Sequence, residues 1–177
     1  MQDKNWGVSN LTLQRINSVE ISNFRSYSTK KVFNFQNGFN LISGENGAGK
    51  TSLRLAIVLG LFSRPGGKGL ESIMRSGSKP VVKIEFVAEE GTYTIEKTFN
   101  KSPSGATATL TNIDTGDIII IPDEAVFRCR QLITGSEESI INKIDGNLIR
   151  LDDEITKAKK FAEGEVTKIL GNNMGSL

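Results

Sequence analysis

The stretch GENGAGKT at residues 44–51 constrains this chain more than any other part of its sequence. It fits the phosphate-loop pattern G-x-x-x-x-G-K-[ST], with Gly44, Gly49, Lys50 and Thr51 at the fixed positions. Residues 38–43 before it read as a short apolar strand, and residues 52–62 after it read as a helix. Strand, glycine-rich loop and helix in this order are the setting that the motif requires. The sequence therefore predicts a nucleoside-triphosphate site at the start of a helix.

The residue types of the motif suit that chemistry. Glycines allow backbone N–H groups to curl around a polyphosphate without clashes from Cβ atoms. The N-terminus of the following helix points its N–H groups and its positive dipole end at the anion. Lys50 is expected to reach the β and γ phosphates, and the Thr51 hydroxyl is expected to ligate Mg²⁺.

Composition narrows the possible classes of function. With 177 residues the chain is about one domain long. It has no histidine, which excludes Ser-His-Asp catalysis, Cys-His catalysis and His-ligated zinc within this chain. Its one cysteine, Cys129, excludes an internal disulfide and is compatible with a reducing compartment. No run approaches about 18 apolar residues and no secretory signal is recognisable, so we expect an intracellular protein with no membrane span.

Alternating apolar residues predict several strands on both sides of the phosphate loop. We expect a strand from Arg15, a turn at 23–27, a strand at 31–35 and a strand at 39–43 that leads into the loop. One or two helical turns are expected at 70–75, followed by four further strands: 81–87, 93–99, 106–111 and 117–121. A doubly wound fold would instead alternate strand and helix along its length. The pattern therefore predicts an α/β lobe with an antiparallel appendage.

The C-terminal third reads as helical. Pro122 is placed to begin a helix, whereas residues 126–133 are ambiguous between strand and helix. From Ser136 an apolar stripe predicts roughly nine helical turns, either a coiled-coil arm, which we favour, or an amphipathic helix packed on the lobe. The expected organisation has four parts: an N-terminal arm (1–14), the lobe (15–135), a coiled-coil-type helix (136–170) and a frayed or truncated end (171–177).

Four motifs occur together in an order that is typical of one family. They are ISNFRSY at 21–27, FNF at 33–35, GFNLISGENGAGKTS at 38–52 and KIEFVAEEGTYTIEKTF at 83–99. Together they resemble the N-terminal lobe of SMC-like ABC ATPases, most of all the SbcC type. That type is the ATPase subunit of a DNA double-strand-break repair complex that works with a metal-dependent nuclease. The resemblance covers roughly residues 15–155 and implies a P-loop ABC-type ATPase head with antiparallel β hairpins and the start of a coiled-coil helix.

The resemblance also implies roles for single residues. ATP and Mg²⁺ would be the cofactors, and Arg25 and Ser26 would contact the nucleotide from the turn after the first strand. The phosphate cradle would consist of Asn46, Gly47, Ala48, Gly49, Lys50, Thr51 and Ser52. Gln131 would match a glutamine that the family carries at the end of a strand, where it holds Mg²⁺ and senses the γ phosphate; the alternative is an exposed polar side chain before a loop. The chain departs from the family at Leu55 and Leu132, where aspartate and glycine are usual, and the second departure bears on Gln131.

Hydrolysis needs carboxylates that orient Mg²⁺ and the attacking water. In the family these lie in a C-terminal lobe, together with a serine-glycine signature. Asp123 and Glu124 follow an apolar run but stand in the wrong order for that role, so we interpret them as the first turn of a helix. The resemblance thus implies half of an ATPase head, which binds nucleotide weakly, if at all, without its other lobe.

The implied partners are a C-terminal ATPase lobe, a second head in a head-to-head dimer, DNA and a nuclease subunit, in the cytoplasm of a prokaryote or the nucleus of a eukaryote. The net charge of +2 does not by itself indicate nucleic-acid binding, and the cations Lys30, Lys31, Arg64, Lys68, Arg75 and Lys79 are scattered. Two alternatives stay open. One is a non-hydrolytic, nucleotide-gated interaction module, and the other is a free-standing phosphate-loop enzyme that uses Asp123 or Glu124.

Overall fold

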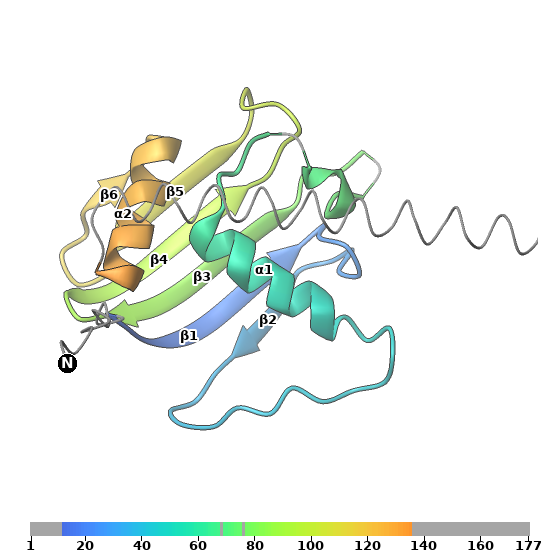
Figure 1. Cartoon of the computed structure of the whole chain (residues 1–177), viewed down its shortest axis with the longest axis horizontal. Coiled ribbons are helices and arrows are strands. Elements are labelled where there is room, and N and C mark those ends of the chain that lie inside the picture. Colours follow the sequence, from blue (N-terminus) through green and yellow to red (C-terminus); the bar gives the residue numbers. More distant parts are fainter. Residues whose placement is uncertain (1–11, 68, 76, 136–177) are drawn as a thin grey trace, which may run out of the picture.

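One antiparallel sheet organises the part of the chain that the structure describes. A computed structural model gives residues 12–67, 69–75 and 77–135. The sheet has six strands in the order β2-β1-β3-β4-β5-β6, and each pair of neighbours is antiparallel (Figure 1). The strands are β1 (Leu13–Ser22), β2 (Lys31–Asn34), β3 (Val81–Ala88), β4 (Gly91–Thr98), β5 (Thr107–Asn112) and β6 (Ile118–Ile119).

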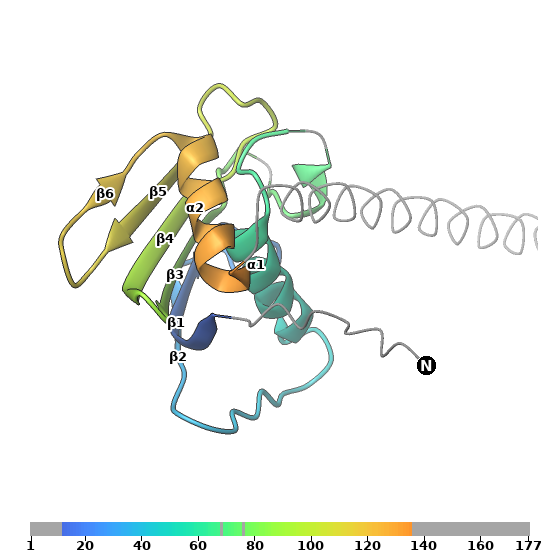
Figure 2. The same cartoon turned by 60° about the vertical axis from the view of Figure 1, so that its left-hand side comes forward.

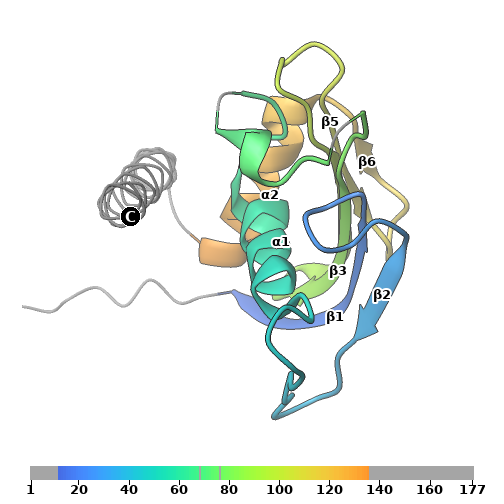
Figure 3. The ribbon, with the colours of Figure 1, turned by 90° about the vertical axis from the view of Figure 1, so that its right-hand side faces the viewer.

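Two helices cover one face of this sheet. Helix α1 (Lys50–Phe62) and helix α2 (Pro122–Thr134) lie on the same side, and the short 3₁₀ helix η1 (Leu70–Ser72) lies at one end (Figure 3). The strands alternate accordingly: Val82, Ile84 and Phe86 of β3 are fully buried, whereas Lys83 between them is exposed. Each such buried apolar side chain contributes roughly 1.5–3 kcal/mol to folding. The period of two in the sequence therefore defines which face carries the helices.

Helix α1 approaches the sheet closely because it carries a glycine at the contact. A Cβ atom on Gly60 would lie 2.5 Å from Ile84 Cδ1 and 2.9 Å from Val82 Cγ1. A larger residue at position 60 would push α1 away from β3. This contact fixes the height of α1 over the sheet, and with it the position of the phosphate loop at the start of the helix.

The predicted fold class is confirmed, with two refinements of the strands. The hairpins do not form an appendage, because β3 pairs directly with β1 over nearly the whole length of both strands. Strand β1 begins at Leu13, two residues before the predicted boundary, and has register shifts between Leu13 and Arg15 and between Ile16 and Ser18. The second shift explains how Ile16 and Val19, three residues apart, both face the core.

The predicted strand at 39–43 is wrong. These residues form no strand, and the side chains of Phe39 and Leu41 are 89% and 76% exposed. A strand requires a neighbour that shares its backbone hydrogen bonds, and no described strand pairs with this segment. The segment instead belongs to a long open loop that leads from β2 to α1 (Figure 1), where the Asn40 side chain bonds the backbone of Gln36.

The ambiguous residues 126–133 are helical. Pro122 occupies the start of α2, and Gly135 ends it in the left-handed conformation, with φ 60°. Buried Val126, Cys129 and Ile133 fall on one face of this helix. The predicted coiled-coil-type helix, the predicted C-terminal end and residues 1–11 of the arm lie outside the described residues. Within the described ranges, no helix is long and apolar enough to cross a membrane.

Two cations lie at the C-terminal end of α1. Lys97 is fully buried on the helix-facing side of β4, and its Nζ donates to the carbonyl oxygens of Ser63 (2.7 Å) and Leu59 (3.3 Å). Arg130 of α2 is also buried, and its Nε donates to the carbonyl oxygen of Phe62 (2.6 Å). The last carbonyls of a helix lack intrahelical partners and carry the negative dipole end. Both cations therefore stabilise α1 and connect it to the sheet and to α2.

We expect Lys97→Met to destabilise the fold, although it fills nearly the same volume. The variant removes charge-assisted hydrogen bonds to buried carbonyls, which are worth about 1.5–3 kcal/mol. Urea unfolding monitored by circular dichroism measures the difference. Lys83→Met is the matched control on β3, because Lys83 forms an exposed ion pair with Glu96 at 3.8 Å, and such pairs contribute about 0–1 kcal/mol. Equal stability of the two variants would contradict the role of Lys97.

The thiol of Cys129 is predicted to be inert in the folded protein. Burial raises its pKa from 9.0 to about 11, and the positive charges of Lys97 and Arg130 offset this only in part. Because the unfolded thiol ionises first, folded-state stability is fully present below about pH 9 and declines as the pH rises towards 11. Titration with a thiol reagent at pH 8 should show no fast reaction in buffer and one reactive thiol in urea. Rapid reaction of the native chain would contradict this prediction.

Candidate functional site

The phosphate loop, residues 44–51, follows the open loop after β2, and its glycines adopt the positive φ values that such a loop requires. Gly47 and Gly49 have φ values of 86° and 97°, which lie in the left-handed region, and Gly44 has φ 153°. The Ala48 N–H donates to the Glu45 carbonyl at 3.2 Å, which closes a turn within the loop. The chain thus curls just before α1, as a loop that surrounds an anion with backbone N–H groups must do.

The N-terminus of α1 is suited to an anion. No acidic residue lies in the first turn of α1, and Gly49 at its N-cap offers no side chain to the helix. Helix α2 differs, because Asp123 and Glu124 occupy its first turn. Acidic side chains there stabilise the positive end of a helix. In α1 the protein supplies no such charge, so this end is available for the phosphates of a ligand.

Lys50 and Thr51 are the first two residues of α1. The Lys50 ammonium lies across the loop and donates to the carbonyl oxygens of Gly44 (2.6 Å) and Glu45 (2.8 Å). Thr51 is exposed on the first turn of α1, and Asn46 and Ala48 are exposed in the loop. An ammonium over the loop and a hydroxyl beside it fit a polyphosphate with Mg²⁺.

The turn between β1 and β2, residues 23–27, packs against the start of α1. The Tyr27 hydroxyl donates to the Gly49 carbonyl at 3.1 Å, and Ser26 Oγ lies 3.2 Å from Ser52 Oγ. Burial raises the pKa of Tyr27, so its hydroxyl remains a protonated donor at neutral pH. The structure thus places Ser26 beside the first turn of α1. The Ser52 side chain is buried and faces the turn.

Arg25 belongs to the same turn and has an unusual backbone. Its φ is 47°, and that of Asn23 is 53°, both in the left-handed region that L residues seldom adopt. The Arg25 N–H donates to the Ile73 carbonyl at 3.0 Å, and Arg75 Nη1 donates to the Arg25 carbonyl at 2.8 Å. Residues 73–75, after η1, therefore hold this turn from the side opposite α1.

The structure does not bring Gln131 to the phosphate loop. The predicted position at the end of a strand is wrong, because Gln131 lies within α2 and its Oε1 accepts a hydrogen bond from Arg128 Nη1 at 2.7 Å. The side chain of its neighbour, Arg130, reaches Phe62 at the C-terminal end of α1. Phe62 comes twelve positions after Lys50 in this helix, which is about 18 Å at a rise of 1.5 Å per residue. A direct bond from Gln131 to a metal at Thr51 does not fit this arrangement.

Asp123 and Glu124 are also distant from the loop. Asp123 Oδ1 lies 3.7 Å from Arg64 Nε, and Arg64 follows the C-terminal end of α1. These carboxylates therefore lie about one helix length from Lys50, and they occupy the first turn of α2, as expected. This position argues against a free-standing enzyme that uses either of them on a nucleotide.

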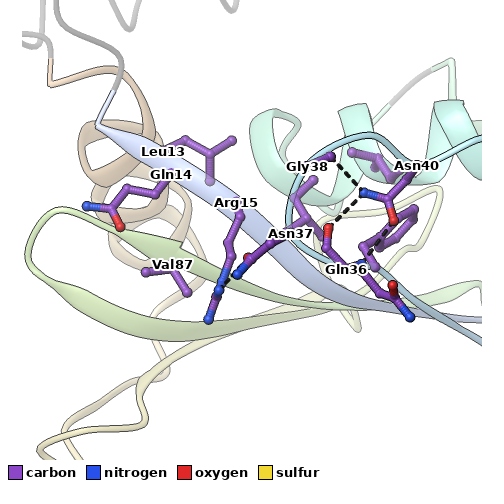
Figure 4. Close-up of a pocket in the computed structure, with 11 residues that line it drawn as sticks. Leu13, Gln14, Arg15, Gln36, Asn37, Gly38, Asn40 and Val87 are labelled. Carbon is purple, nitrogen blue, oxygen red and sulfur yellow. Dashed lines mark hydrogen bonds between the residues drawn. The ribbon is translucent and has the colours of Figure 1, made fainter.

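A hollow of about 690 Å³ lies beside the open segment, between β1, the loop after β2 and α1 (Figure 4). A hydrogen bond from Arg15 Nη1 to Asn37 Oδ1 at 2.6 Å joins two of the residues that line it. No predicted nucleotide-binding residue lines this hollow. Its lining is Leu13, Gln14, Arg15, Ile16, Phe35, Gln36, Asn37, Gly38, Asn40, Ile57 and Val87.

The contacts of Tyr27 and Arg75 at this site could not be predicted from local sequence patterns. Tyr27 stands beside the predicted Arg25 and Ser26, yet only the tertiary structure shows its bond to Gly49. Arg75 is fifty residues from the carbonyl that it holds. Contacts of this range depend on how η1 packs beside the turn, which local sequence patterns do not specify.

Comparison with known proteins gives consistent matches. Residues 18–173 match a family model described as AAA domain. The chain is 28% identical over 144 residues to a DNA double-strand break repair Rad50 ATPase of Thermoplasma acidophilum, which covers 80% of this chain and 16% of the relative. It is 35% identical over 94 residues to the Rad50 ATPase of Pyrococcus abyssi, which covers 50% and 11% of the two chains.

A second kind of relative is the chromosome partition protein Smc of Thermoplasma acidophilum, 37% identical over 82 residues, with 43% of this chain and 7% of the relative covered. The matches agree in one respect. The chain spans 16% or less of the length of each of these relatives.

Gly49→Ala should destabilise the loop more than Gly47→Ala does. Both positions have positive φ, which costs an L residue roughly 1–2 kcal/mol. Only at Gly49 would the added Cβ also lie 2.7 Å from Tyr27 Oη; nothing lies within 4 Å at Gly47. Tyr27 would then have to leave its ring contact with Phe33. Thermal unfolding of the two variants should differ by about 1 kcal/mol or more, and equal values would show that Tyr27 does not constrain the loop.

Proposed function

Because the chain belongs to the AAA domain family, we propose that it is the ATP-binding N-terminal half of an SMC-like ABC ATPase that acts in DNA double-strand-break repair or chromosome maintenance. The matched Rad50 and Smc proteins confirm the predicted resemblance to SMC-like ATPases. Because the chain covers 16% or less of each of those relatives, membership in the family does not by itself give it their activity.

One observation carries the proposal: the phosphate loop and the β1–β2 turn meet at the uncapped N-terminus of α1. Lys50 lies over the loop and Thr51 beside it. Ser26 and Tyr27 connect the turn to Ser52 and Gly49, which supports a role for Arg25 of the same turn in contacting the nucleotide. ATP would be bound by the loop and the helix end, and Thr51 would supply a protein ligand to Mg²⁺.

Hydrolysis would require a second lobe. The side chains of Phe39, Leu41 and Ile42 project from an extended segment that no described strand pairs with. The neighbouring hollow adds apolar side chains of Leu13, Ile16, Phe35, Ile57 and Val87. Exposed apolar surface of this kind is typical of an interaction site. A C-terminal lobe that adds a strand along residues 39–43 would cover it and would bring the carboxylates that phosphoryl transfer needs.

The remaining partners follow from the same proposal. Two such heads would bind nucleotide between them, DNA and a metal-dependent nuclease would be the macromolecular partners, and the protein would work where DNA is, in the cytoplasm of a prokaryote or the nucleus of a eukaryote. The alternative of a nucleotide-gated interaction module depends on residues 141–169, which lie outside the described part of the chain.

Lys50→Ala should lower the affinity for Mg²⁺·ATP by about tenfold or more, because a charge-assisted contact to the phosphates is lost. Isothermal titration of the full chain, with a C-terminal lobe present, measures this affinity. When a C-terminal lobe is supplied as a separate chain, Mg²⁺-dependent ATP hydrolysis should appear, and Lys50→Ala should abolish it.

Arg54→Ala is the matched control. Arg54 is an exposed cation one turn further along α1. Its replacement by alanine lowers the net charge by one, as Lys50→Ala does, but leaves the residues of the phosphate loop unchanged. Equal effects of the two substitutions would contradict a specific role of the loop lysine. A chain that stays silent with the second lobe present would count against the ATPase proposal.

A further inference from the structure

Residues 73–75 contact the β1–β2 turn on the side opposite the phosphate loop. We propose that Arg75 is a positioning residue for nucleotide binding, which acts by holding the backbone of Arg25 and thereby the whole turn against the start of α1. The inference rests on the proposed function for the identity of its ligand. It goes beyond that function because Arg75 belongs to none of the motifs that point to ATP.

Both backbone polar groups of Arg25 are held by the segment after η1. Arg75 Nη1 donates to the Arg25 carbonyl at 2.8 Å, and the Arg25 N–H donates to the Ile73 carbonyl at 3.0 Å. Met74, between them, forms an antiparallel bridge with Phe24. Figures 1 and 3 show η1 and the turn side by side at the same end of the sheet.

The turn needs such external support. Asn23 and Arg25 both have φ near 50°, a conformation that is unfavourable for L side chains and that persists only where the surroundings impose it. Phe24 anchors the turn by burial and by an edge contact with Phe99, with ring centroids 6.4 Å apart. The anchor fixes position 24, whereas the guanidinium of Arg75 and the Ile73 carbonyl fix the peptide groups of Arg25.

The far side of the turn faces the ligand site. Ser26 lies against Ser52 and Tyr27 donates to Gly49, so the turn contacts the helix N-cap and the first turn of α1. If the Arg25 peptide relaxes towards an ordinary conformation, the Arg25 side chain and the two contacts to α1 shift together. Arg75 therefore influences phosphate binding through the turn.

Direct attraction between Arg75 and a phosphate is the competing explanation, because this side chain is exposed. Three substitutions separate the two. Arg75→Lys keeps charge and donor, Arg75→Gln keeps a donor without charge, and Arg75→Met keeps neither. If Arg75 acts by positioning the turn, Arg75→Lys should bind Mg²⁺·ATP as tightly as the wild type, and Arg75→Gln should bind it more tightly than Arg75→Met. If Arg75 instead attracts a phosphate directly, Arg75→Gln should bind as weakly as Arg75→Met.

The experiment combines two measurements on the full chain. With a C-terminal lobe supplied as a separate chain, Arg75→Met should lower the affinity for Mg²⁺·ATP about fivefold, the value expected for one lost hydrogen bond. In hydrogen exchange read by mass spectrometry, without nucleotide, the same variant should accelerate exchange of residues 23–27 about fivefold and leave α1 unchanged. Lys79→Met is the control, because Lys79 is a nearby exposed cation that donates to the Gly105 carbonyl and not to the turn.

Unchanged exchange of residues 23–27 in Arg75→Met would overturn the proposal, as would an affinity for Arg75→Gln no better than that of Arg75→Met. If the wild-type chain does not bind Mg²⁺·ATP even with a C-terminal lobe supplied as a separate chain, the proposed function fails, and with it the nucleotide as the ligand that Arg75 serves. The exchange measurement would then still decide whether Arg75 holds the turn.

Discussion

The capping of α1 is the interaction on which the rest of the structure depends. Its C-terminal carbonyls receive hydrogen bonds from buried Lys97 and Arg130, and these cations also stabilise the negative end of the helix dipole. Its N-terminus carries neither an acidic side chain nor a side-chain cap. Side chains of the protein thus stabilise the C-terminal end of α1, whereas no side chain of the described residues caps its N-terminal end. Gly60 adds the geometric part, since it lets α1 lie directly on β3.

The site at that N-terminus combines segments that are distant in the sequence. The β1–β2 turn lies between the phosphate loop and residues 73–75, and it holds two residues in the left-handed region. Backbone strain of this kind is found where a precise arrangement serves binding. The same turn carries Arg25 and Ser26, the two residues for which the family resemblance implies contact with nucleotide.

The described part of the chain also has an exposed apolar edge. Figure 2 shows the segment between β2 and α1 extending beyond the sheet and both helices. Its apolar residues and the adjoining hollow are the kind of surface that proteins cover with another chain or domain. Within the described residues, the phosphate loop therefore joins an uncovered segment, residues 39–43, to the well-packed helix α1.

Much of this could be predicted from the sequence. The phosphate loop, α1, the hairpins and the start of α2 at Pro122 follow from local rules: glycine conformation, alternation of apolar residues and proline at a helix start. The prediction failed where the outcome depends on a neighbour. Residues 39–43 have the composition of a strand but find no pairing strand among the described residues, and residues 126–133 became helical because α2 buries one face against β5 and α1.

The sequence by itself thus determined the ligand class of the loop and the identity of most elements, because each depends on residues close together in the chain. Only the tertiary structure decided which distant groups serve the loop. It brought Tyr27 to Gly49 and Arg75 to Arg25, and it placed Gln131 near the opposite end of α1. A pattern specifies conformation locally, whereas the contacts of GENGAGKT depend on how the turn, η1 and α2 pack on the two ends of one helix.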